Sequence, residues 1–168
     1  MAAGSLHRRM QITALQEGTK ASDFTLEGSA GTFTLSEALK KHRFVILSFF
    51  PLAFSPVCTD EMSLFQEVQD EFERLGAMTV GISVDSRYVQ HEFAKKTNVR
   101  FPLLADFHPK GAVAEKYGVM RDDGIAERAL FIVDSDGVIR YSYVSELRVN
   151  PGADRLIEKL EALQGRKR

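Results

Sequence analysis

The chain has 168 residues, of which 44% are hydrophobic and 27% are charged. Such a length and composition are typical of one globular domain that buries its core without disulfide or metal support. The 22 basic and 23 acidic residues give a net charge of −1, which provides no basic face for nucleic acid. The one cysteine, Cys58, excludes an internal disulfide, a CxxC redox pair and a cysteine-rich metal cluster. Cys58 is therefore either an inert packed thiol or a reactive one.

Targeting and membrane signals are weak. The longest apolar run, residues 44–57, contains two prolines and two serines and is too short for a membrane helix. We expect residues 1–10 to form a solvated tail, with a short organellar presequence as the alternative, and residues 164–168 to form a basic tail. A lone free thiol fits a cytoplasmic, reducing environment.

The first elements predicted along the chain are a hairpin, a short helix and a buried strand. Short alternations of apolar and polar residues at 23–26 and 32–35 flank the turn-forming segment EGSAG. Ser36 is expected to cap a brief helix. The dense apolar run FVILSFF, at 44–50, is typical of a central strand buried on both faces, and Pro51 ends it.

A helical pattern follows Cys58. Apolar residues recur at helical spacing from Met62 to Leu75, which predicts one amphipathic helix of four to five turns that Gly76 closes. The apolar run at 78–84 predicts a second strand. A strand–helix–strand unit of this kind is expected to be parallel and right-handed.

The second half of the chain continues the alternation of helices and strands. We expect helices at 86–97, 110–117 and 153–163, a short strand at 101–106, and a hairpin of 129–134 and 138–143 around Ser-Asp-Gly. Together the elements predict an α/β fold of the thioredoxin-like kind, with a mixed central sheet flanked by helices. One domain would span residues 11–163.

The position of Cys58 favours a reactive thiol. It lies in the first turn of a helix beyond the end of a buried strand, where sites gather in open α/β sheets. Free N–H groups and the positive end of the helix dipole stabilise a thiolate, which is the nucleophilic form. Asp60 and Glu61 oppose this effect, so a reactive Cys58 needs a cation from elsewhere in the chain. The residues alone leave open that Cys58 is a small buried apolar side chain.

The segment PLAFSPVCTDE, residues 51–61, resembles the P-x-x-x-T/S-x-x-C active-site segment of the peroxiredoxins. Further blocks in the order of that family are GTKASDFTL at 18–26, VGISVDS at 80–86, FPLLAD at 101–106, KYGV at 116–119 and RALFIVD at 128–134. Ser22 stands where proline is usual. The resemblance covers about residues 11–163 and is strongest to the one-cysteine alkyl hydroperoxide reductase E type, followed by the bacterioferritin-comigratory-protein type.

The resemblance implies roles for five residues. Cys58 would be the peroxidatic cysteine, whose thiolate attacks a hydroperoxide and becomes a sulfenic acid. Ser55 would donate a hydrogen bond to the peroxide, Arg128 would supply the missing cation, and Pro51 would wall the pocket. Glu61 would pair with Arg128 and orient it. Besides Cys58, the other four also have plainer interpretations: Ser55 as a helix-entry residue, Arg128 in a solvent-facing salt bridge, Pro51 as the end of a strand, and Glu61 as an acid that favours the helix dipole.

The missing second cysteine implies a one-cysteine mechanism with no cofactor and no metal. Ser63, either native or a replacement, stands where many bacterioferritin-comigratory proteins have a resolving cysteine. The sulfenic acid would then be reduced by an external thiol: a low-molecular-weight thiol, thioredoxin or a glutaredoxin-like protein. The resemblance also implies a homodimer formed through loops near the active site. The alternatives are a redox sensor or holdase chaperone on the same scaffold, and an inert thioredoxin-like interaction module.

Overall fold

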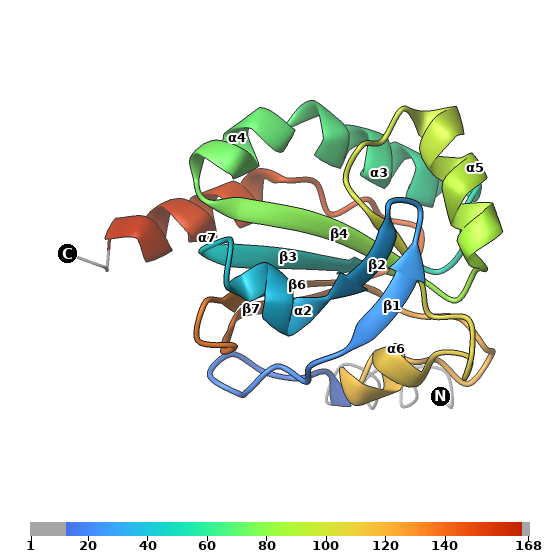
Figure 1. Cartoon of the computed structure of the whole chain (residues 1–168), viewed down its shortest axis with the longest axis horizontal. Helices are drawn as coiled ribbons and strands as arrows, with labels where there is room; N and C mark the ends of the chain where they lie inside the picture. The colour runs from blue at the N-terminus through green and yellow to red at the C-terminus, as the bar shows by residue number, and fades with distance from the viewer. Residues whose placement is uncertain (1–12, 166–168) are drawn as a thin grey trace.

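A seven-stranded mixed sheet forms the centre of the computed structural model, which describes residues 13–165 (Figure 1). The strands are β1 (Thr25–Gly28), β2 (Gly31–Thr34), β3 (Phe44–Phe49), β4 (Ala77–Ser83), β5 (Leu103–Ala105), β6 (Arg128–Asp134) and β7 (Ile139–Ser145). Their order is β2-β1-β5-β4-β3-β6-β7, with β3, β4 and β5 parallel and β6 antiparallel to β3. The predicted α/β fold with a mixed central sheet is confirmed.

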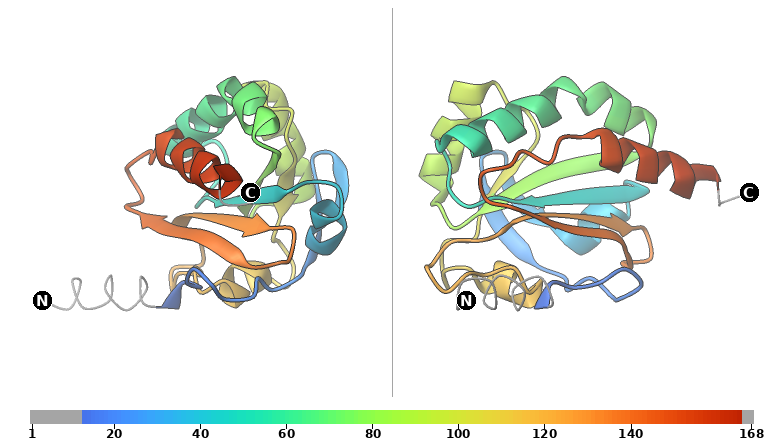
Figure 2. Two further views of the ribbon diagram at one scale, coloured as in Figure 1. Left: turned by 90° about the vertical axis from the view of Figure 1, so that its left-hand side faces the viewer. Right: turned by 180° about the vertical axis from the view of Figure 1, so that it is seen from behind.

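Helices cover both faces of this sheet. They are α2 (Leu35–Leu39), α3 (Pro56–Glu67), α4 (Gln69–Arg74), α5 (Arg87–Thr97), α6 (Ala112–Lys116) and α7 (Asp154–Gly165). Helices α3, α4, α5 and α7 lie on one face, and α2 and α6 lie on the other (Figures 1 and 2). Across residues 13–165, none of the helices is long and apolar enough to cross a membrane. The tail predicted at 1–10 lies outside the described residues, whereas residues 164 and 165 of the predicted C-terminal tail belong to α7.

Strand β3 is buried along its whole length because both of its faces are covered. Val45, Leu47 and Phe49 pack into the core beneath α2 and α6. Phe44 and Ile46 pack into the second core, beneath α3, α4, α5 and α7. Burying a side chain of this size stabilises the fold by roughly 1.5–3 kcal/mol. The prediction of a central strand buried on both faces is confirmed.

The single long helix predicted after Cys58 is in fact two helices. Helix α3 ends and α4 begins around Val68, whose backbone (φ −102°, ψ 13°) is not helical. The apolar period nevertheless survives the break, because the rings of Phe65 and Phe72 meet in one core with centroids 6.2 Å apart. The sequence pattern therefore predicted the buried face correctly and the continuity of the helix wrongly.

The two serines near helix starts behave differently. Ser86 caps α5 by accepting a hydrogen bond from the Val89 N–H at 3.2 Å, as an N-cap serine does. Ser36 is not a cap, because α2 begins one residue earlier with Thr34 at the cap position. Instead the Ser36 N–H donates to Oδ1 of Asp23 at 2.9 Å, so the acceptor comes from a preceding segment.

Gly28 lies where β1 and β5 approach each other closely. A Cβ atom here would lie 2.3 Å from the carbonyl oxygen of Leu103, so any side chain has to displace a strand. We expect Gly28→Ala to lower the free energy of unfolding in urea by about 1–3 kcal/mol. Gly165→Ala is the matched control, because no atom lies within 4 Å of the added carbon. Equal unfolding free energies for the two variants would contradict this account of the β1–β5 contact.

Candidate active site

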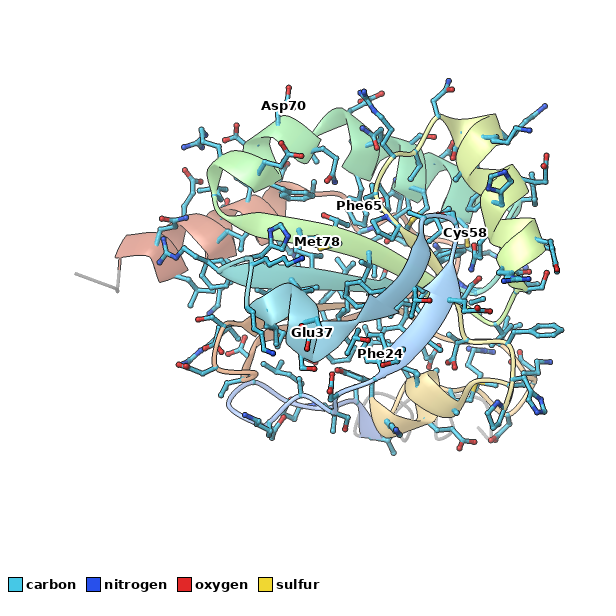
Figure 3. All side chains as sticks on the ribbon, in the orientation of Figure 1. Phe24, Glu37, Cys58, Phe65, Asp70 and Met78 are labelled. Carbon is cyan, nitrogen blue, oxygen red and sulfur yellow. The ribbon has the colours of Figure 1, made fainter. Side chains whose placement is uncertain are left out.

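Three segments distant in sequence meet at the carboxyl end of β3. Phe49 pairs with Ala129 across β3 and β6, so Arg128, the first residue of β6, lies beside the exit of β3. Arg128 pairs in turn with Ser145, the last residue of β7. Backbone pairing therefore brings together the loop after β3, the start of β6 and the loop after β7. Figure 3 shows Cys58 at this end of the sheet.

Cys58 is the third residue of α3, as its predicted place in a first helical turn requires. Ser55 occupies the N-cap position and Pro56 is the first helical residue. Proline is favoured there because the first N–H groups of a helix have no intrahelical acceptor. Cys58 is 0% exposed and packs in the same core as Phe50 and Met62. The thiol is thus both buried and at the positive end of a 12-residue helix.

The guanidinium of Arg128 holds the site together. Its Nη2 donates to Sγ of Cys58 at 3.2 Å, and its Nη1 donates to Oε1 of Glu61 at 2.8 Å. Its Nε donates to the carbonyl oxygen of Leu147 at 2.9 Å. Arg128 is only 2% exposed, so a solvent-facing salt bridge is excluded. The cation that a reactive Cys58 requires is present, and three acceptors fix its plane.

Glu61 has one paired and one unpaired carboxyl oxygen. Its Oε2 is buried and has no hydrogen-bond partner within residues 13–165. Burial raises the pKa of Glu61 from its ordinary 4.5 to about 7, although the charge and the hydrogen bond of Arg128 act in the opposite direction. A protonated Glu61 does not neutralise Arg128, so the positive charge then remains available to the sulfur of Cys58.

Pro51 and Ser55 border the site from the loop before α3. Pro51 is buried at the end of β3. The Ser55 hydroxyl donates to the carbonyl oxygen of Leu52 at 2.9 Å, and the Ser55 carbonyl accepts a hydrogen bond from the Thr59 hydroxyl at 2.9 Å. In this arrangement Ser55 orders the loop rather than contacting the sulfur. Its predicted role as a donor to peroxide requires rotation of the side chain and stays a prediction.

Asp85 was missed by the sequence reasoning. It follows β4, the parallel neighbour of β3, and its Oδ2 accepts hydrogen bonds from the Ala53 N–H (2.8 Å) and the Ser83 hydroxyl (2.6 Å). Its carboxylate thereby anchors the loop before α3, in which Phe54 has a φ of +69° that is uncommon for a residue with a side chain. The available signal was a polar residue just beyond a strand in a parallel sheet.

Metal ligands do not gather anywhere in the described part of the chain. No group of three or more histidine, cysteine, aspartate or glutamate side chains within residues 13–165 is arranged to hold a metal ion. Beside Cys58 lies the guanidinium of Arg128, which is also paired with the carboxyl of Glu61. The site can therefore stabilise an anion on sulfur or on an oxygen bound beside it.

Comparison with known proteins adds sequence relatives. A family model described as the AhpC/TSA family matches residues 18–142. A chloroplastic 2-cysteine peroxiredoxin from Chattonella marina var. antiqua is 34% identical over 162 residues, covering 90% of this chain and 82% of that protein. Alkyl hydroperoxide reductase E from Mycobacterium tuberculosis is 35% identical over 133 residues, covering 79% of this chain and 87% of that protein.

Solved structures share the fold. Peroxidoxin BcpB from Mycobacterium tuberculosis matches with a TM-score of 0.78 and 30% identity, covering 89% of this chain and 98% of that structure. The reduced 2-Cys peroxiredoxin of Plasmodium vivax matches with a TM-score of 0.83 and 25% identity, covering 91% of this chain and 84% of that structure. The thioredoxin-like arrangement predicted from the sequence is confirmed.

The anchor at Asp85 predicts how well Cys58 is protected. A buried thiol reacts with an alkylating reagent only when its surroundings open, so we expect slow alkylation of the wild type by iodoacetamide. Asp85→Ala removes the acceptor of the Ala53 N–H and should speed alkylation about 5- to 30-fold, as the loss of one such interaction implies. Asp85→Asn keeps a side-chain oxygen and should lie between the two. Indistinguishable rates for all three proteins would rule out the anchoring role.

The raised pKa of Glu61 predicts a pH-dependent stability. Because the folded state binds the Glu61 proton more tightly, this contribution is full below about pH 4.5 and is lost as pH rises through about 7. In a Cys58→Ser background, where no thiol titrates, the free energy of unfolding should fall by on the order of 2–3 kcal/mol over this range. Adding Glu61→Gln should remove that part of the fall. A pH profile unchanged by Glu61→Gln would contradict the assignment.

Proposed function

Because the chain belongs to the AhpC/TSA family and is a peroxiredoxin, a thiol-dependent peroxidase, we propose that it reduces hydrogen peroxide and alkyl hydroperoxides by a one-cysteine mechanism at Cys58. The observation that carries the proposal is the 3.2 Å hydrogen bond from buried Arg128 to the sulfur of Cys58. A guanidinium at this distance stabilises the thiolate of Cys58, and the thiolate is the nucleophile that this reaction needs.

In the first step the Cys58 thiolate attacks the terminal oxygen of the hydroperoxide. An S–O bond forms and the O–O bond breaks, and the leaving oxygen takes a proton and departs as alcohol or water. Negative charge moves from sulfur to the leaving oxygen, and the N–H groups of Arg128 stabilise it along that path. In this proposal the Ser55 hydroxyl leaves the Leu52 carbonyl to donate to the peroxide. Pro51, which has no N–H, limits water around the sulfur.

Peroxide reaches the buried sulfur when the loop of residues 51–55 moves. The side chains of Leu52 and Phe54 in this loop are 41% and 49% exposed, and the contact that the movement has to break is that of the Phe54 ring with the Phe93 ring, whose centroids lie 5.1 Å apart. The positive φ of Phe54 marks it as the strained point of the loop. The anchor from Asp85 to Ala53 limits the movement and returns the loop to its closed position.

The sulfenic acid on Cys58 is reduced by thiols from outside the chain, because the sequence contains no second cysteine. One thiol attacks the sulfenic sulfur, an S–S bond replaces the S–O bond, and water leaves. A second thiol then displaces Cys58 and carries away the disulfide. A low-molecular-weight thiol, thioredoxin or a glutaredoxin-like protein has the required chemistry. A reducing compartment such as the cytoplasm supplies such thiols.

A homodimer formed through the same end of the sheet is part of the proposal. Four large apolar side chains are exposed where the parallel strands end: Leu52 and Phe54 after β3, Tyr88 after β4, and Phe107 after β5. Exposed apolar side chains that gather in one region are typical of surfaces covered by a partner. A second copy of the chain docked here would shield the loop that covers Cys58.

No observation favours a sensor or holdase role over peroxidase turnover.

The peroxidase proposal is tested by the rate at which stoichiometric peroxide oxidises reduced protein. Mass spectrometry should find one added oxygen on Cys58, and Cys58→Ser should be inert. Arg128→Gln should slow the reaction about 10²- to 10³-fold, the usual effect of removing one donor to developing charge. Arg140→Gln is the matched control, because Arg140 pairs with Asp134 at the other end of β6. A rate for Arg128→Gln within twofold of the control would refute the role of Arg128.

A further inference from the structure

A shallow groove of about 380 Å³ lies next to the reacting centre. Its lining residues come from the segment before β6 and the loop after β7: Arg121, Glu127, Glu146, Leu147 and Arg148. Leu147 connects this groove to the reacting centre, because its carbonyl oxygen accepts the hydrogen bond from Nε of Arg128. The mechanism at Cys58 uses none of the charged side chains of this groove.

Glu127 is a buried carboxylate with only one oxygen paired. It is 2% exposed, and its Oε1 accepts a hydrogen bond from Nη1 of Arg121 at 3.1 Å. The guanidinium of Arg121 also forms an ion pair with Asp123, whose Oδ1 lies 3.1 Å from Nε of Arg121. The Oε2 atom of Glu127 is buried and has no hydrogen-bond partner in the described part of the chain. A buried carboxylate oxygen without a donor is unfavourable, so Glu127 favours a ligand that brings a charged N–H donor.

Arg148 supplies the opposite charge. Its side chain is exposed and makes no ion pair or side-chain hydrogen bond to any residue between 13 and 165. An unpaired guanidinium binds carboxylates well, because its planar N–H groups match two carboxylate oxygens. The groove therefore offers an acceptor for an ammonium group and a donor for a carboxylate, with Leu147 as an apolar wall.

We infer that this groove binds the reductant, and that the reductant is a small zwitterionic thiol of the cysteine or glutathione type. The inference rests on the proposed one-cysteine mechanism and names its thiol. The ammonium group donates to Oε2 of Glu127 and the carboxylate pairs with Arg148. The thiol is thereby held beside Arg128, whose guanidinium contacts the sulfur of Cys58. It attacks the sulfenic sulfur to form the mixed disulfide and water, and a second thiol releases Cys58.

Binding is tested with S-methylglutathione, which keeps the ammonium and carboxylate groups but has no free thiol. We expect chemical-shift changes at the backbone amides of Glu127, Leu147 and Arg148 in the wild type. Glu127→Gln and Arg148→Gln should each weaken binding about 10-fold or more, as the loss of a charged hydrogen bond implies. Arg148 is exposed, so its variant keeps the fold even where Glu127→Gln does not. Asp122→Asn, an exposed acid outside the groove lining, is the charge-matched control.

Steady-state peroxide reduction separates this inference from the proposed function. With glutathione as reductant, kcat/KM should fall about 10-fold or more in both groove variants, whereas with uncharged dithiothreitol it should stay within twofold. Equal losses with both thiols, absence of S-methylglutathione binding, or turnover by a protein thiol alone would overturn the groove assignment and leave the peroxidase intact. Failure of Cys58 to react with peroxide while S-methylglutathione still binds would overturn the proposed function instead.

Discussion

Arg128 is a buried cation that contacts two acidic groups, the Cys58 thiol and the Glu61 carboxyl. The chemistry of the site depends on which of these two groups carries the negative charge. Removing a guanidinium from water costs several kcal/mol unless other groups replace the water. Cys58, Glu61 and the Leu147 carbonyl are those groups. If both acids ionised, one cation would face two buried anions. Because burial raises the pKa of Glu61 to about 7, the carboxyl can carry a proton while the sulfur carries the negative charge.

The sheet makes this arrangement rigid. Arg128 opens β6, and its antiparallel register with β3 sets it beside the loop that leads to Cys58. On its other side Arg128 pairs with Ser145 of β7, which brings the Leu147 carbonyl oxygen within hydrogen-bond distance of Nε of Arg128. Asp85 holds the loop from the neighbouring parallel strand. The Arg128 guanidinium, the Cys58 thiol and the loop that covers it therefore lie at one end of the sheet. The charged groove beside Leu147, which the peroxidase mechanism does not use, lies at the same end.

Much of this could be predicted from the sequence, because the signals were local. The apolar run of β3, the helix start at Cys58 and the family-like blocks around Arg128 each occupy a few consecutive residues. The break at Val68 could not be predicted, because the apolar period continues across it. The roles of Asp85 and of the Leu147 carbonyl depend on which strands are neighbours, and a backbone carbonyl has no residue-type signature. The hydrogen bond of Ser55 to Leu52 also appears only once the loop is folded.

The most direct test of the account is the ultraviolet absorbance of the thiolate followed against pH in the wild type and in Arg128→Gln. Cys58 is the only cysteine, so subtracting the titration of Cys58→Ser, which contains the same tyrosines, isolates its signal. If Arg128 holds the negative charge on sulfur, as its 3.2 Å hydrogen bond to Cys58 indicates, the thiolate absorbance near neutral pH should be clearly larger in the wild type than in the variant. Coincident titrations would show that Arg128 does not stabilise the thiolate, and would contradict the account.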